Sequence, residues 1–229
     1  VNNMKIAIIG AGNMGGALAC GLARGTKVAA GNIWLSNPTY GKLAAVKNEF
    51  PDINVTTDNC EAASAADLII LAVKPYKVQQ VVEEIKNCVD YSTQTIASMV
   101  GGLGVAQLDE WLKKEDAPLP PVYLIIPNTA IATMSSMTFI ASLRSTKAMD
   151  GALLDIFNEL GEAMLVEERL MMAGTSLASC GIAYAMRYIR AAMVGGIELG
   201  FRPDEAKRIV MQTMRGAVDV LAASNAHPE

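Results

Sequence analysis

Near the start of the chain lie three glycines at the spacing G-x-G-x-x-G, and this motif most constrains the fold. An apolar run at residues 6–9 precedes them, and a helix-forming run follows from Asn13. Such an apolar run predicts a buried parallel strand. In that setting Gly10 permits a tight turn, Gly12 lets a phosphate approach the backbone, and Gly15 lets the helix pack closely on the sheet. The helix would direct its free N–H groups and positive dipole end at the phosphate, so the motif predicts dinucleotide binding, with a purely structural turn as the alternative.

The end of the predicted second strand, residues 32–35, bears on the choice of cofactor. In a dinucleotide-binding fold this strand end faces the adenosine ribose. Ser36, Asn37 and Thr39 are neutral there, and Lys42 follows one turn later. An Asp or Glu would repel a 2′-phosphate, so its absence favours NADP over NAD. The alternative is a plain turn that starts a helix.

Strands and helices alternate over roughly the first 140 residues, which predicts a doubly wound parallel sheet. From residue 148 the pattern changes to a helix at 150–160 and one edge strand at 163–166. Only helical periodicity follows, over residues 168–180, 183–199 and 203–224. We therefore expect an α/β fold, with an N-terminal Rossmann-type doubly wound sheet over residues 1–167 and an all-α C-terminal dimerisation domain over 168–229. The C-terminal helices are so apolar that we expect them to pack against a second copy.

Composition excludes several classes of function. The net charge is −4 and basic blocks are missing, which argues against nucleic acid as a partner. The longest apolar runs, such as 68–73, fall far short of the roughly 20 residues that a membrane span needs, and we expect no signal peptide. The four cysteines lack C-x-x-C spacing and His227 is the single histidine, so we expect neither a metal site nor a disulfide framework, in a reducing cytoplasm.

Taken together, the motifs resemble those of the pyrroline-5-carboxylate reductase family. An Ala-Val-Lys-Pro segment after a buried strand, followed later by Pro-Asn-Thr, is more specific than the glycine spacing. The resemblance covers nearly the whole chain. The matching segments are 8–17 (IIGAGNMGGA), 36–37, 58–59, 67–75 (DLIILAVKP), 98–103 (SMVGGL), 127–129, 181–184, 200–201, 212–213, 216–217 and 227–228.

The resemblance implies an oxidoreductase that reduces 1-pyrroline-5-carboxylate to L-proline with NADP(H) or NAD(H), the last step of proline biosynthesis. It also implies a cytoplasmic homodimer, with dimers that can assemble further and a small-molecule substrate at the dimer interface. Such chemistry suits a chain without a His–Asp or Ser–His pair, because a protonated imine accepts a hydride readily. Placement of the two reacting carbons then supplies much of the acceleration.

The resemblance also implies positions for the site residues. Those at the pyrophosphate would be Gly10, Gly12, Asn13 and Met14, and those at the adenosine ribose or its phosphate would be Ser36 and Asn37. The cofactor cleft would be lined by Asn59, Ala72, Val73, Lys74 and Pro75. The residues near the nicotinamide would be Val100, Gly101, Pro127 and Asn128. Candidates on the substrate side are Cys180 and Gly181.

The sequence departs from the family pattern at four places. Pro38 stands where the family often has an arginine for the 2′-phosphate, which leaves NADP and NAD both open. The arginine and second proline around Pro-Asn-Thr are missing. Cys180 replaces a serine, and we expect a small buried residue there rather than a reactive thiol. The family continues past Glu229 into a Thr-Ser-Pro-Gly-Gly-Thr-Thr loop that carries substrate-binding groups, so either the chain is truncated or it is a divergent member.

Two alternatives stay open. A β-hydroxyacid dehydrogenase shares the glycine motif, but it carries a catalytic lysine in the first helix of its second domain. Residues 181–192 contain Arg187 and Arg190 and no lysine, which counts against this class. The second alternative is a dimer that binds NAD(P) and has no reductase activity.

Overall fold

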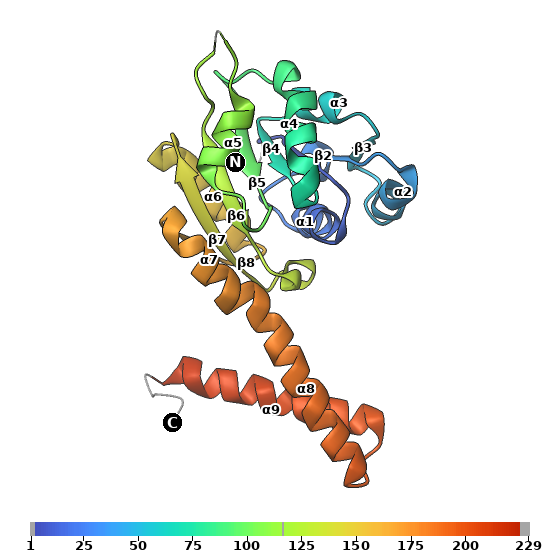
Figure 1. The fold of residues 1–229 in the computed structure, drawn as a ribbon. Helices are drawn as coiled ribbons and strands as arrows, with labels where there is room; N and C mark the ends of the chain where they lie inside the picture. Colours follow the sequence, from blue (N-terminus) through green and yellow to red (C-terminus); the bar gives the residue numbers. More distant parts are fainter. Residues whose placement is uncertain (1–2, 116, 225–229) are drawn as a thin grey trace. The chain divides into compact units, whose positions relative to one another are not determined.

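A computed structural model describes residues 3–115 and 117–224 of the chain. The motif residues His227 and Pro228 lie outside the described residues. The chain divides into two compact units, Val1–Ser179 and Cys180–Glu229. The first unit contains the sheet, and the second contains two long helices (Figure 1).

The first unit is built on an eight-stranded sheet in the order β3-β2-β1-β4-β5-β6-β7-β8. Strands β1 to β6 run parallel to one another. The chain thus leaves β1 toward β2 on one side and returns to β4 on the other, which is the switch point of a doubly wound sheet. The strands are β1 (Ile6–Ile9), β2 (Ile33–Ser36), β3 (Asn54–Thr56), β4 (Leu68–Leu71), β5 (Thr95–Ser98), β6 (Val122–Ile126), β7 (Ser136–Leu143) and β8 (Gly161–Leu165).

Helices cover both faces of the sheet, because successive side chains of a strand point to opposite faces and every residue of β1, β4, β5 and β6 is buried. On β1, Ile6 and Ile8 pack with α1, α2 and α6, whereas Ala7 and Ile9 pack with α3, α4 and α5. The predicted α/β fold class is therefore confirmed. The helices of this unit are α1 (Asn13–Arg24), α2 (Tyr40–Glu49), α3 (Asn59–Ser64), α4 (Val78–Ile85), α5 (Val105–Leu112), α6 (Lys147–Asn158) and α7 (Met171–Gly174).

The expectation of a wholly parallel sheet is wrong for its last two strands. β7 pairs antiparallel with β6, and β8 then pairs parallel with β7. A parallel return needs a crossover of about a dozen residues or more, usually a helix. Only a short 3₁₀ segment, Thr129–Thr133, joins β6 to β7, so the chain turns back directly.

The second unit consists of α8 (Cys180–Glu198) and α9 (Pro203–Ala223). The predicted start of α9 is confirmed, because Pro203, Asp204 and Glu205 form its first turn. Within one chain Ala206 is the only buried described residue of these two helices. Large apolar side chains are exposed along both, among them Tyr184, Met186, Tyr188, Val194, Ile209, Met211, Val218 and Val220. The unit therefore presents apolar surface that a single copy does not cover.

The cysteines differ from what the sequence suggested. Cys60 and Cys88 form a disulfide, with their Cα atoms 5.6 Å apart, so the expectation of no disulfide is wrong. The two cysteines are 28 residues apart, and only the packing of α3 beside the end of α4 brings them together. Cys180 is exposed at the first position of α8, which contradicts the expectation of a buried residue. Burial raises the pKa of the remaining thiol, Cys20.

Glu159, just after α6, holds the turn that follows α1. Its carboxylate accepts hydrogen bonds from the Thr26 amide at 2.6 Å, the Thr26 hydroxyl at 2.7 Å and the Lys27 amide at 3.0 Å. Partial burial alone would raise the pKa of Glu159, but these hydrogen bonds outweigh it and lower the pKa. The ionised carboxylate is therefore the form that the fold favours.

Replacing Glu159 by glutamine is expected to lower the free energy of unfolding at neutral pH by a few tenths to about 1 kcal/mol. Because the folded pKa is depressed, the wild-type advantage is present above the ordinary pKa of about 4.5 and disappears as pH falls through the folded pKa. Urea denaturation at several pH values measures the difference. A gap that stayed constant down to pH 3 would show that charge has no part in it.

Candidate active site

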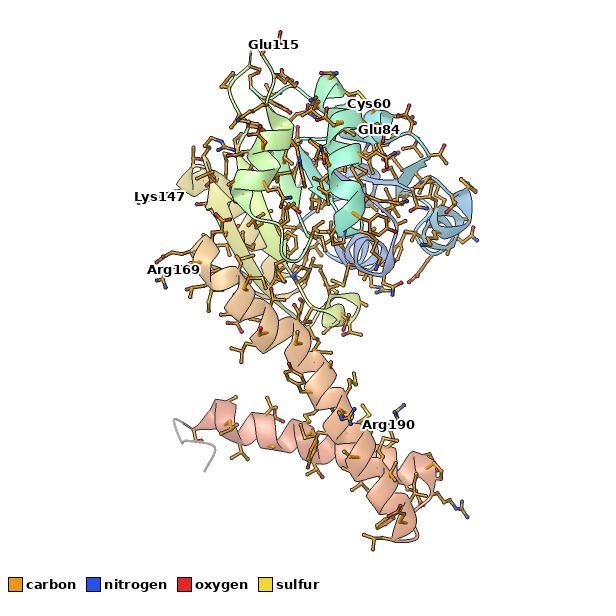
Figure 2. The ribbon with its side chains drawn as sticks, viewed as in Figure 1. Cys60, Glu84, Glu115, Lys147, Arg169 and Arg190 are labelled. Atoms are coloured by element: carbon orange, nitrogen blue, oxygen red, sulfur yellow. A yellow bond between two sulfur atoms is a disulfide. The ribbon has the colours of Figure 1, made fainter. Side chains whose placement is uncertain are left out.

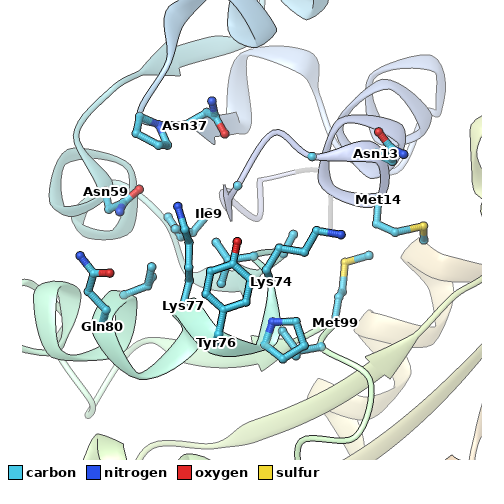
Figure 3. Close-up of a pocket in the computed structure, with 18 of the residues that line it drawn as sticks. Ile9, Asn13, Met14, Asn37, Asn59, Lys74, Tyr76, Lys77, Gln80 and Met99 are labelled. Atoms are coloured by element: carbon cyan, nitrogen blue, oxygen red, sulfur yellow. The ribbon is translucent and has the colours of Figure 1, made fainter.

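A cavity of about 750 Å³ in the first unit lies at the carboxyl ends of β1, β2, β4 and β5 (Figure 3). This position is the switch point of the sheet, where open α/β sheets bind their ligands. The volume falls within the usual range for cofactor pockets. Its walls come from the glycine loop, the segments after β2, β4 and β5, and the starts of α3 and α4.

The glycine loop fits a nucleotide, and its three glycines do not all serve the same purpose. Gly10 has φ +113°, and a Cβ there would lie 2.7 Å from the Ala72 carbonyl oxygen. A Cβ on Gly15 would lie 1.9 Å from the Gly10 carbonyl oxygen. Gly12, the N-cap of α1, has an ordinary φ of −74° and no atom within 4 Å of a built Cβ. Gly10 and Gly15 therefore serve internal packing, whereas Gly12 leaves the cavity open at a helix N-terminus, where an anion binds.

Asn37 joins this loop to the segment after β2. Its side-chain oxygen accepts from the Ala11 amide at 3.2 Å, and its side-chain nitrogen donates to the Thr39 hydroxyl at 2.8 Å. Asn37 is buried yet borders the cavity. It thus fixes the loop that would carry the pyrophosphate relative to the strand end that would face the ribose.

A second series of polar contacts lies at the end of the cavity beside β2 and α3. The hydroxyl of the fully buried Ser36 donates to Oδ1 of Asn59 at 2.7 Å. Nδ2 of Asn59 donates to Oε2 of Glu84 on α4 at 3.0 Å. Asn59 itself follows Asp58, which caps α3 by accepting from the amides of Cys60 and Glu61. Ser36 therefore orients Asn59, which in turn borders the cavity.

Most of the predicted cofactor residues converge on this one cavity. Those that line it are Gly10, Gly12, Asn13, Met14, Asn37, Asn59, Ala72, Val73, Lys74, Pro75, Val100 and Gly101. Ser36, Pro127 and Asn128 are not among its lining residues. Asn128 instead caps the 3₁₀ segment after β6, and the Pro127 carbonyl accepts from the Ser179 hydroxyl at 3.1 Å. Cys180 and Gly181 belong to the second unit, and their role on the substrate side stays a prediction.

The sequence reasoning missed one wall of the cavity. Lys77, Gln80 and Glu84 line it from the 3₁₀ turn Pro75–Lys77 and from α4. Their spacing of three and four places them on one helix face. The apolar residues Val78, Val82 and Ile85 are buried on the adjoining face. This helix follows the carboxyl end of β4. The polar residues on its second face are the sequence signal that could have identified the wall.

Two family models match the chain. Residues 5–99 match the model described as NADP oxidoreductase coenzyme F420-dependent, and residues 168–229 match that described as pyrroline-5-carboxylate reductase dimerisation. A pyrroline-5-carboxylate reductase 2 from Dictyostelium discoideum is 34% identical over 100% of this chain and 79% of its own length. The chain belongs to the pyrroline-5-carboxylate reductase family. This confirms the resemblance drawn from the motifs.

A solved structure of a family member has the same fold as this chain. A pyrroline carboxylate reductase from Plasmodium falciparum, crystallised with NADP bound, superposes with a TM-score of 0.88. It is 26% identical, and the match covers 100% of this chain and 82% of that one. A second Dictyostelium discoideum relative, pyrroline-5-carboxylate reductase 1, is 34% identical over 98% of this chain and 42% of its own length. The likeness to the family thus extends across both units.

Within residues 3–115 and 117–224, no group of three or more His, Cys, Asp or Glu side chains is arranged to hold a metal ion. Over the same residues, no helix is long and apolar enough to cross a membrane.

Proposed function

We propose that this chain reduces 1-pyrroline-5-carboxylate to L-proline, with NADPH as the reductant and NADH as the alternative. The observation that carries the proposal is the cavity at the β1–β4 switch point, bordered by an open Gly12, in a chain of this family. When bound, the reduced nicotinamide supplies the hydride. The predicted cofactor residues are proposed to act as the resemblance implies, with Ser36 acting through Asn59.

The residues of this chain would act mainly by placement. The amides at the start of α1 and the open backbone at Gly12 would hold the pyrophosphate. Met99, Val100 and Gly101, which follow β5, form the cavity wall at which the resemblance places the nicotinamide. Among the described residues that line the cavity, the titratable ones are Tyr76, Glu84 and three lysines, and none is a histidine. This inventory fits a reaction in which orientation supplies much of the rate.

The domain organisation, assembly and location are also part of the proposal. We propose residues 1–167 as the dinucleotide-binding domain and 168–229 as the helical dimerisation and substrate domain, in a homodimer that can assemble further. The exposed apolar faces of α8 and α9 and the match to the dimerisation model support this. Pro127 and Asn128 are proposed to lie near the nicotinamide, and Cys180 and Gly181 on the substrate side. We propose the cytoplasm as the compartment and expect neither nucleic acid nor membrane as partner.

A coupled binding and turnover measurement tests the function. The intact natural protein is mixed with NADPH or NADH and 1-pyrroline-5-carboxylate, and the loss of reduced-nicotinamide absorbance and the formation of proline are followed. We expect turnover with NADPH that requires the pyrroline. NADPH binding without turnover would refute reductase activity and favour the non-catalytic alternative. Turnover of a 3-hydroxy acid, with none of the pyrroline, would favour the dehydrogenase alternative.

A further inference from the structure

Three lysines line the cavity, and they lie on different walls. Lys42 comes from the first turn of α2, Lys74 from the segment after β4, and Lys77 from the 3₁₀ turn before α4. Each is exposed, and among the described residues none takes part in an ion pair. The one carboxylate of the cavity lining is Glu84, which accepts from Asn59. The cavity thus carries more positive than negative charge, as a site for an anionic ligand does.

Lys74 and Lys77 point toward different ends of this cavity, as Figure 3 shows. The Lys74 side chain extends toward Asn13 and Met14, at the glycine loop. The Lys77 side chain extends toward Asn37 and Asn59, at the ends of β2 and α3. The first end is where a pyrophosphate meets the start of α1, and the second is where an adenosine ribose meets the end of β2.

We propose that Lys77 recognises the 2′-phosphate of NADP(H) from the β4 side of the cavity, and so sets the preference for NADP(H) over NAD(H). This assignment of Lys77 rests on the proposed function, since it assumes that a dinucleotide binds in this cavity. The segment after β2, which usually supplies the cation for a 2′-phosphate, has Pro38 directly after Asn37. Lys77 would provide that charge from the opposite wall, and Lys42 is placed to assist from α2.

The local geometry explains why a lysine at this position can reach the ribose end. Pro75 starts the 3₁₀ turn, and the Lys77 amide donates to the Lys74 carbonyl at 2.8 Å, which fixes the backbone of both lysines. Val78, the next residue, is fully buried and anchors the start of α4. The backbone of Lys77 is therefore held while its long side chain stays free to follow an anion.

Adenosine 2′,5′-bisphosphate and adenosine 5′-monophosphate separate the two anion positions. Both carry the 5′-phosphate, and only the first carries the 2′-phosphate. Calorimetric titration of the intact protein is expected to show tighter binding of the bisphosphate. Lys77→Gln should weaken the bisphosphate about tenfold and leave the monophosphate unchanged, because one charge-assisted contact is lost. Lys77→Arg should retain the binding of the bisphosphate.

Lys74→Gln is the matched control, because the same substitution is made three residues away on the same segment. It should weaken both nucleotides by a similar factor, since both carry the phosphate that would lie at the glycine loop. The proposal for Lys77 is overturned if Lys77→Gln weakens both nucleotides equally or neither. Equal weakening would point to a general electrostatic effect, and no weakening would show an ordinary solvated lysine.

These outcomes are independent of catalysis. Selective loss of bisphosphate binding in Lys77→Gln, with no reduction of pyrroline carboxylate by the wild type, supports the assignment of Lys77 and refutes the reductase. Turnover by the wild type, with unselective nucleotide binding in Lys77→Gln, supports the reductase and overturns the assignment. If the wild type binds neither nucleotide, the assignment of Lys77 also fails. In an active enzyme, the variant should raise KM for NADPH and leave KM for NADH unchanged.

Discussion

Replacing Gly12 by valine is expected to weaken the binding of NADP(H) by about a hundredfold or more while leaving the fold intact. No atom lies within 4 Å of a Cβ built on Gly12, and its φ of −74° suits any residue. The added side chain would therefore meet no protein atom at its Cβ, and it would occupy the approach of the pyrophosphate to the backbone. Titration of cofactor fluorescence and thermal unfolding of the free protein measure the two effects.

Two neighbouring glycines provide the comparison. Gly16→Ala, also with no atom within 4 Å of its built Cβ, lies inside α1 and should bind cofactor normally. Gly15→Ala should lower both cofactor binding and the free energy of unfolding, because its Cβ would lie 1.9 Å from the Gly10 carbonyl oxygen. Normal cofactor affinity in Gly12→Val would mean that the pyrophosphate lies elsewhere in the cavity.

Removing the Cys60–Cys88 disulfide is expected to lower the free energy of unfolding by about 3–4 kcal/mol. The bond closes a loop with a sequence separation of 28, and the value follows from the chain-entropy model for a loop of that size. The oxidised protein and the double variant Cys60→Ser/Cys88→Ser are compared by urea denaturation.

Reduced wild type and a variant of a third cysteine, Cys180, are the controls for this prediction. Wild type treated with a reductant should match the double variant, because both lack the cross-link. Cys180→Ser should show no loss, since Cys180 is exposed and has no disulfide partner among the described residues. If oxidised wild type and the double variant unfold at the same urea concentration, the cross-link contributes nothing measurable. In a reducing cytoplasm the two thiols would be the form to expect, and the lower stability would then apply.

Much of the fold was predictable because local patterns and tertiary packing agree. The strand at residues 6–9 is found where the apolar run predicted it, buried as β1. The glycine loop and the segment 72–75 come together because both follow neighbouring parallel strands, β1 and β4. Carboxyl ends of parallel strands meet at one edge, so the sequence order of such motifs is enough to place them together.

The features that were not predicted depend on packing between segments far apart in the chain. β7 runs antiparallel to β6 because the connection between them is short. The strand patterns alone do not show the direction in which the second strand runs. The disulfide joins residues that the packing of α3 and α4 brings close. The cavity wall that contains Lys77 and Glu84 is the face of α4 that stays unburied once the apolar face of this helix packs in the core. None of these follows from local spacing alone.

The carboxylate of Glu159 has a consequence for synthesis on the ribosome. It binds the amides of Thr26 and Lys27, which precede it by 133 and 132 residues. β1 and α1 therefore emerge and can pair with their near neighbours long before this last partner is available. The turn after α1 gains its final hydrogen bonds only when α6 has left the exit tunnel. Slow amide exchange at Thr26 and Lys27 would thus report that the sheet unit has assembled as far as α6, and not merely its first half.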